Sequence, residues 1–179
     1  MSWIIKGTGI MRFRGLAILA FTGLVLLSSC KVKYSFSGAS IPAAAKTISI
    51  QYFQNRASLV QPSLSQTLTE SLIDRCKSQT GLQLVNGPGD VNFEGEITDY
   101  KTATLTISGD ARAAVNRFTI SVRVRYTNIL EPESSYEQVF SRHEDYDSNL
   151  DLSQVEQSLS TKIVELLVED IFNRAFVNW

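Results

Sequence analysis

Polar and apolar residues alternate most regularly between Ala113 and Ile129. This period of two predicts a strand with one buried face and one face in water. The expected core face holds Phe118, Ile120, Val122, Val124 and Tyr126, and the expected outer face holds Arg117, Thr119, Ser121, Arg123, Arg125 and Thr127. One side of the predicted sheet is therefore polar.

Four more segments have the composition of strands. They are Thr47–Phe53, Leu82–Val85, Val91 to about Ser108, and Tyr136–Tyr146. In the first of them Ile48, Ile50 and Tyr52 are expected to face inward. Turns are predicted at Asn86–Asp90, at Ser108–Asp110 and at Glu131–Ser134, where Gly, Pro and acidic residues gather.

Within two of these strands the pattern predicts which side chains share a face. In the segment from Val91 to about Ser108, one face is expected to hold the alternate residues Phe93, Gly95, Ile97 and Asp99. Tyr136, Gln138, Phe140 and Arg142 share one side of the last segment, and Val139 lies on the other.

Two segments have the period of an amphipathic helix. After Pro62, apolar residues recur every four positions at Leu64, Leu68, Leu72 and Cys76, and Gly81 is a natural stop. Ser153 to Glu156 has the spacing of a capping box and predicts the start of a helix that runs nearly to the C-terminus. Its apolar stripe comprises Val155, Leu159, Ile163, Leu166, Leu167, Ile171 and Ala175.

The order of these elements predicts an α+β fold. We expect a two-layer sandwich, with two amphipathic helices on one face of a mostly antiparallel sheet of about four strands. The second face of the sheet is then polar and open to solvent.

The N-terminus has the pattern of a targeting segment. Lys6, Arg12 and Arg14 precede an apolar run at positions 16–27, which ends in the sequence Leu-Ser-Ser-Cys at Cys30. The run is shorter than the roughly 20 residues that a transmembrane helix needs. The segment resembles a bacterial lipoprotein signal peptide with its lipobox, and Met11 would also begin a complete signal.

This resemblance implies three regions. Residues 1–29 form a cleaved signal peptide, residues 30–46 form a lipidated tether that begins at Cys30, and residues 47–179 form one α+β domain. Several acyl chains at Cys30 would hold the protein to a membrane, whereas a single chain binds only marginally.

Charge and composition exclude several classes of function. Without the signal, 14 Lys and Arg stand against 18 Asp and Glu, with no basic run, so no nucleic-acid partner is expected. Cys76 is the second of two cysteines and is expected to be a buried structural thiol. His143 lacks a second histidine or a cysteine pair, so no metal is expected. Glu94 and Glu96 share a strand face, but no nucleophile or phosphate-binding motif accompanies them. We expect no enzyme and no cofactor beyond a covalent lipid on Cys30.

The arginines of the outer face are the remaining candidates for a site. Arg117, Arg123 and Arg125 project from one strand, and neighbouring guanidinium groups match phosphate or carboxylate groups. Two interpretations stay open. The row either keeps the exposed face soluble, or it binds an anionic partner such as a lipid phosphate or an acidic protein surface.

Several segments, in this order after the lipobox, resemble one family. They are Tyr34–Pro42, Lys46–Ala57, Pro62–Gln66, Phe93–Ile97 and Val168–Asn173. Together they resemble the lipopolysaccharide-assembly lipoprotein family LptE in its Bacteroidetes branch, over residues 34–179.

The resemblance implies a non-enzymatic outer-membrane lipoprotein. Such proteins sit as a plug in the LptD-type β-barrel translocon and help to insert lipopolysaccharide (LPS) into the outer leaflet. Arg117, Arg123 and Arg125 would then contact LPS or the barrel. Lys31 is not the aspartate that retains enterobacterial lipoproteins in the inner membrane. A competing class is a periplasmic lipoprotein that pilots or scaffolds another outer-membrane complex, such as a secretin.

Overall fold

The computed structural model describes residues 44–59, 61–105 and 115–177, all within the unit Ser37–Trp179. In chain order the elements are β1 (Thr47–Ile50), β2 (Gln54–Asn55), α2 (Leu64–Gln79), β3 (Gln83–Leu84), β4 (Val91–Leu105), β5 (Val115–Asn128), η1 (Pro132–Ser134), β6 (Tyr136–Asp147) and α3 (Leu152–Phe176). Cys30 and the predicted turn at Ser108–Asp110 lie outside the described residues.

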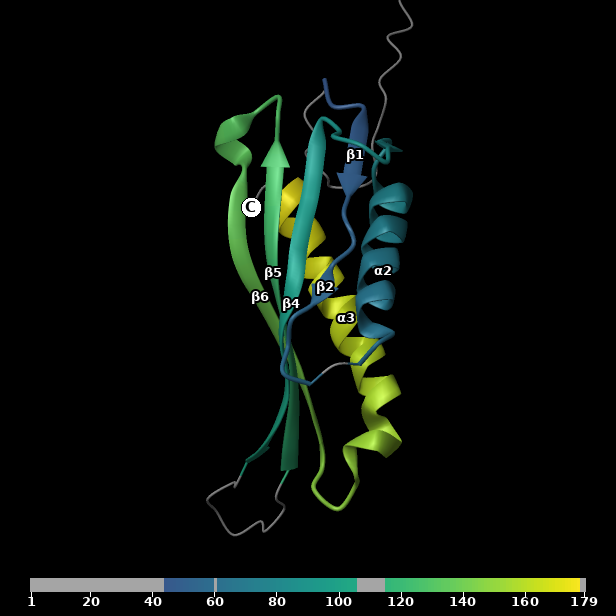
Figure 1. Cartoon of the computed structure of the whole chain (residues 1–179), viewed down its shortest axis with the longest axis vertical. Helices are drawn as coiled ribbons and strands as arrows, with labels where there is room; N and C mark the ends of the chain where they lie inside the picture. The colour runs from purple at the N-terminus through teal and green to yellow at the C-terminus, as the bar shows by residue number, and fades with distance from the viewer. Residues whose placement is uncertain (1–43, 60, 106–114, 178–179) are drawn as a thin grey trace, which may run out of the picture. The chain divides into compact units, whose positions relative to one another are not determined.

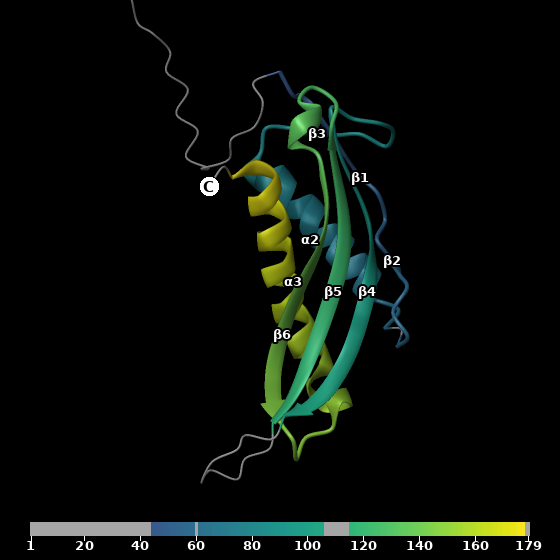
Figure 2. The same ribbon diagram turned by 90° about the vertical axis from the view of Figure 1, so that its left-hand side faces the viewer.

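Two layers make up this unit, as the sequence predicts. A sheet forms one layer, and α2 and α3 lie together on one of its faces (Figure 1). Turning the molecule shows that, within the described ranges, neither α2 nor α3 lies on the other face of β4, β5 and β6 (Figure 2). Among the described residues, neither helix combines the length and the hydropathy that a membrane crossing would need.

The sheet has six strands and is mixed, so the expected count of about four was too low. Its order is β3-β1-β4-β5-β6, and β2 pairs separately with β4. The pairs β1–β3, β1–β4 and β2–β4 are parallel, whereas the long pairs β4–β5 and β5–β6 are antiparallel. Five of the six strands correspond to segments with the predicted composition of strands. The sixth, β2, was not predicted because it is only two residues long, too short for any periodicity.

Two ends of the sheet can be named by the residues found there. The Lys46 end holds the start of β1, β4 and β6 and the finish of β5, because Ile48 and Asn128 both pair with Val91. The Leu105 end holds the finish of β4 and β6 and the start of β5 and α3. These two names are used below.

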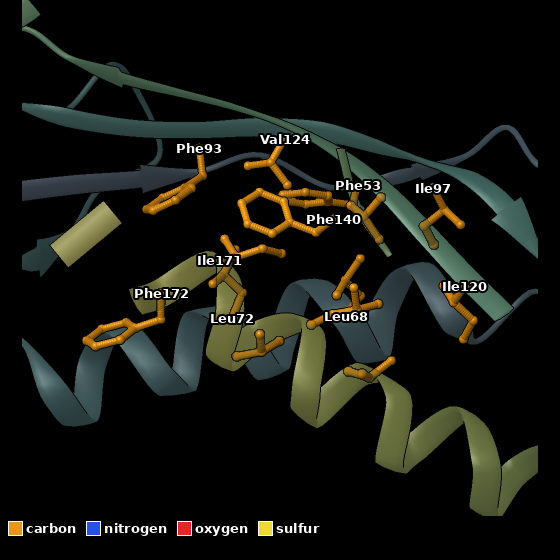
Figure 3. Packing of buried hydrophobic residues seen from close by; sticks show 14 of the residues in the cluster. Phe53, Leu68, Leu72, Phe93, Ile97, Ile120, Val124, Phe140, Ile171 and Phe172 are labelled. Carbon is orange, nitrogen blue, oxygen red and sulfur yellow. The ribbon is translucent and has the colours of Figure 1, made fainter. Parts of the chain in front are cut away.

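The core lies between the helices and the inner face of the sheet. The five predicted inward residues of β5 are all buried, and Leu64, Leu68, Leu72 and Cys76 of α2 pack against that face. Figure 3 shows Phe53, Phe93 and Phe140 meeting Leu68, Leu72 and Ile171 there. At the Lys46 end the ring of Phe93 lies 5.0 Å from Tyr126 and 5.9 Å from Phe176, measured between ring centroids. These contacts fix the last turn of α3 against the sheet.

The parity predicted for Asp99 is wrong because β4 contains an irregularity. Its register with β5 shifts between Ile97 and Asp99. An extra residue reverses the faces of a strand beyond it, so Tyr100 points into the core and is only 3% exposed. Its hydroxyl donates a short hydrogen bond to the carboxylate of Glu156 on α3.

The inward position predicted for Tyr52 is also wrong. The chain leaves regular pairing after Ile50, so the period of two does not continue to Tyr52, which is 57% exposed. Phe53 takes the core position and is fully buried. Its backbone N–H donates to Oγ1 of Thr69 on α2 at 3.1 Å, which ties this crossing to the helix.

Helix ends and one stripe residue differ from prediction. α3 begins after Asp151, so Ser153 lies inside the helix and no capping box forms. Glu156 bonds Tyr100 instead. Leu166 is exposed, whereas Val164, Val168, Phe172 and Phe176 are buried, because the stripe of a 25-residue helix drifts around its axis. α2 ends at Gln79, close to the predicted stop at Gly81.

Candidate partner-binding surface

The outer face of β4, β5 and β6 brings the predicted arginines together with carboxylates. Alternation along β5 puts the arginines on this face, and the antiparallel register sets what lies beside them. Glu96 pairs with Arg123, and Arg125 lies between Glu94 and Glu137. Arg117 pairs with Asp145. Each guanidinium therefore has an acidic neighbour on an adjacent strand.

The two arginines nearer the Lys46 end form neighbouring but separate ion pairs. Nη1 of Arg123 donates to Oε1 of Glu96 at 2.8 Å. Nε and Nη2 of Arg125 donate to Oε2 of Glu137 at 3.0 and 2.9 Å, and Nη1 lies 3.9 Å from Oε2 of Glu94. The bonds to Glu137 raise the pKa of Arg125. We call these five residues the charged ladder.

Arg117 forms a separate pair closer to the Leu105 end. Its Nε and Nη2 donate to the two carboxylate oxygens of Asp145 at 2.8 and 2.9 Å. Such a two-bond geometry is the strongest that an arginine and a carboxylate form. The bonds lower the pKa of Asp145 and raise that of Arg117. His143 lies exposed on the same face, opposite Thr119.

A shallow hollow of about 340 Å³ lies beside the charged ladder. Its lining includes the backbone of Gly95 and the exposed ring of Tyr52. Gln51 also lines it and donates from Nε2 to Oε1 of Glu94 at 2.8 Å. The hollow is open and polar, so it fits a contacting side chain better than an enclosed small molecule.

The chemistry of this face suits binding rather than catalysis. Two arginines meet three carboxylates in the charged ladder, and all five side chains remain partly in water. An anion that binds here must compete with carboxylates already in place. A partner surface with charges of both signs can form new ion pairs with both the arginines and the carboxylates of the charged ladder. Such complementary charges contribute more to the specificity of binding than to its affinity.

Other residues considered from the sequence are not brought into this face. Cys76 is buried on α2, and burial raises the pKa of its thiol to about 12. In the part of the chain that the structure describes, no group of three or more His, Cys, Asp or Glu residues is placed to hold a metal ion.

A clamp at Asp90 was not predicted from the sequence. Oδ2 of Asp90 accepts hydrogen bonds from the backbone N–H of Lys46 at 2.8 Å and of Thr47 at 2.9 Å, and from the Thr47 hydroxyl at 2.9 Å. These bonds lower the pKa of Asp90, with the bond from Lys46 as the largest cause. A local sequence pattern carries no signal for this clamp, because the bonded residues lie 43 and 44 positions from Asp90 in the chain.

The described part of the chain is thus a two-layer α+β unit, with two helices on one face of a mixed sheet and ion pairs on the other. The chain belongs to the LptE family, described as lipopolysaccharide-assembly, whose family model matches residues 45–175. No curated protein matches the chain.

Two solved structures, each with a TM-score of 0.50, share the fold at low sequence identity, and a third structure is also similar. A hypothetical protein from Chlamydia trachomatis is 14% identical with a TM-score of 0.50, over 75% of this chain and 100% of that one. A putative neuraminyllactose-binding hemagglutinin homolog from Helicobacter pylori is 11% identical with a TM-score of 0.50, over 78% and 88%. An uncharacterized lipoprotein B from Nitrosomonas europaea is 16% identical with a TM-score of 0.49, over 79% and 87%.

Proposed function

We propose that this protein is an outer-membrane lipoprotein that serves as plug and assembly partner of an LptD-type β-barrel translocon. In this role it helps to insert LPS into the outer leaflet. The observation that carries the proposal is the match to the lipopolysaccharide-assembly family over residues 45–175. The assignment to the Bacteroidetes branch stays a prediction from the resemblance.

The proposal includes the anchoring of the chain. Residues 1–29 are removed as a signal peptide, Cys30 carries the lipid, and residues 30–46 tether the domain of residues 47–179. The order of basic residues, apolar run and small residues before Cys30 supports this. No enzymatic step and no cofactor belongs to this role.

The outer face of the sheet is the proposed contact surface, through Arg117, Arg123 and Arg125. A barrel lumen is hydrated and lined by polar side chains of both signs. The charged ladder is likewise mixed, with three carboxylates beside two guanidinium groups. A lone lipid phosphate would meet those carboxylates as well as the arginines. We therefore place a lumen surface with charges of both signs ahead of LPS phosphates as the partner of this face.

The test is a mild-detergent purification of the tagged, lipidated protein from outer membranes, with mass spectrometry of the proteins that accompany it. A stoichiometric large barrel of the LptD type is the expected result. A secretin in its place, or no barrel at all, would overturn the proposed role. A Cys30→Ala variant, which should leave the membrane fraction, tests the anchor separately.

A further inference from the structure

The connection between β5 and β6 presents two large aliphatic side chains to solvent at the Lys46 end. Ile129 is 57% exposed and Leu130 is 42% exposed. They are adjacent in the sequence and follow the last residue of β5. Single exposed aliphatic side chains are common on protein surfaces. An adjacent pair indicates a contact site only if the backbone holds both side chains toward solvent.

A buried asparagine fixes that presentation. Asn128 is 2% exposed, and its Oδ1 accepts hydrogen bonds from the N–H groups of Leu130 and Glu131, each at 3.0 Å. Its Nδ2 donates to Oγ of Ser134 at 3.0 Å. η1 follows, with Pro132 at its start. The loop is therefore held by side-chain hydrogen bonds from a core position, with Ile129 and Leu130 directed toward solvent.

The same loop lies beside the point where the N-terminal part of the chain joins the domain. The N–H of Ile129 donates to the backbone carbonyl of Asp90 at 2.9 Å. The carboxylate of that same Asp90 holds the N–H of Lys46 at 2.8 Å. One residue thus links the aliphatic pair to the last position of the proposed tether.

We propose that Ile129 and Leu130 contact the lipid surface to which the protein is anchored, and so orient the domain with its Lys46 end toward the membrane. The inference rests on the proposed lipid at Cys30. Sixteen positions separate Cys30 from Lys46. Even a fully extended chain of that length spans no more than about 53–58 Å, so a lipid at Cys30 keeps the Lys46 end near the membrane.

Tethering makes a small contact sufficient. Two side chains give too little apolar area to bring a free protein to a bilayer, but an anchored domain meets the surface at high effective concentration. Glu131 and Glu133 flank the pair and would be repelled by anionic lipids. The loop therefore fits a surface of zwitterionic headgroups, into which the two aliphatic side chains dip.

The experiment uses the full lipidated protein in vesicles of zwitterionic phosphatidylethanolamine and phosphatidylcholine. An environment-sensitive fluorophore is attached at Ile129→Cys, and at Leu150→Cys as the matched control. Leu150 is 41% exposed and precedes α3, at the Leu105 end. Cys76 is buried and Cys30 is blocked by lipid, so the label goes to the introduced thiol.

The expected result is a shift to shorter emission wavelength and quenching by nitroxide-bearing lipids at position 129, with neither at position 150. Equal responses at the two positions would overturn the inference, even if the vesicles float with the protein and so confirm the anchor. A response at 129 that requires an added LptD-type barrel would also overturn it, in favour of a protein contact. Protein that fails to float would reject the anchor and the inference together.

Discussion

The ring of Phe53 occupies the space beside Gly95 that a side chain at position 95 would need. A Cβ built on Gly95 would lie 2.5 Å from Cε1 of Phe53 and even closer to the backbone carbonyl oxygen of Arg123. The crossing from β1 to β2 thus reaches the core only because β4 has no side chain at this point. The close approach also explains why Phe53 is buried while Tyr52 is exposed.

Replacement of Gly95 should therefore destabilise the fold. For Gly95→Ala we expect a loss of about 1–3 kcal/mol in the free energy of unfolding, the usual cost of overpacking. Urea titration measures it. Gly87→Ala is the matched control, because a Cβ there meets no atom within 4 Å. An equal effect of the two substitutions would contradict the close packing of Phe53 on Gly95.

Stability should fall in acid partly through Asp90. Hydrogen bonds from Lys46 and Thr47 hold its pKa below the ordinary value. A carboxyl group with a lowered folded pKa stabilises the protein above the unfolded pKa of about 3.9, and this contribution is lost as the pH falls through the lower folded value. Asp90→Asn should lower the melting temperature at pH 7 and reduce its dependence on pH below about 4.

Thermal melting at several pH values checks this expectation. Asp74→Asn is the control, because Asp74 is an exposed aspartate on α2. If Asp90→Asn follows the same pH curve as Asp74→Asn, the clamp on Lys46 and Thr47 contributes nothing to acid unfolding.

Loss of the outer-face arginines should affect binding and leave the fold intact. Replacing Arg117, Arg123 and Arg125 together with Ser removes exposed ion pairs, which contribute little to stability. We expect the urea midpoint to change little and recovery of the partner barrel to drop by about tenfold or more, as for charge pairs at protein interfaces.

Arg142→Ser is the control for that experiment. Arg142 pairs with Asp170 of α3 and so belongs to the helix side of β6. It should leave recovery of the barrel unchanged. If the triple variant binds both the barrel and LPS as well as the unaltered protein does, the assignment of this face as the contact surface is wrong.

The thiol of Cys76 should be inert in the folded protein. Burial raises its pKa to about 12, and the thiolate is the reactive form. We expect a thiol reagent to modify it only after denaturation, whereas Ser78→Cys, at an exposed position of the same helix, should react at once. Equal rates at positions 76 and 78 would show that α2 opens readily.

Sequence patterns predicted the elements whose burial is regular. The alternation on β5 placed Phe118 and Tyr126 in the core and Arg123 and Arg125 outside, because that strand pairs along its length with two partners. The predictions of burial failed where the alternation of buried and exposed residues is interrupted. The irregularity after Ile97 moves Tyr100 inward, and the early end of β1 exposes Tyr52.

The candidate site was predicted in part, and for the same reason. Alternation predicts which side chains of one strand share a face, so the three arginines were expected together. It does not predict which residues of the next strand lie opposite. The carboxylates of Glu96, Glu137 and Asp145 that meet the arginines depend on register, which turns and the irregularity in β4 set. The hydrogen bonds that the Asp90 carboxylate accepts from backbone N–H groups correspond to no periodic pattern in the sequence.

The clamp at Asp90 also determines how the domain would respond to mechanical force. With the proposed anchor at Cys30, tension along the chain would pass the packed side chain of Ala45 and then load the hydrogen bonds from Lys46 and Thr47 to that carboxylate. β1 lies parallel to both of its neighbours, so a pull from its N-terminal end along the strand loads its hydrogen bonds with β3 and β4 together, in shear. Under such a pull the hydrogen bonds of β1 would bear the force together, so they would not break one residue at a time.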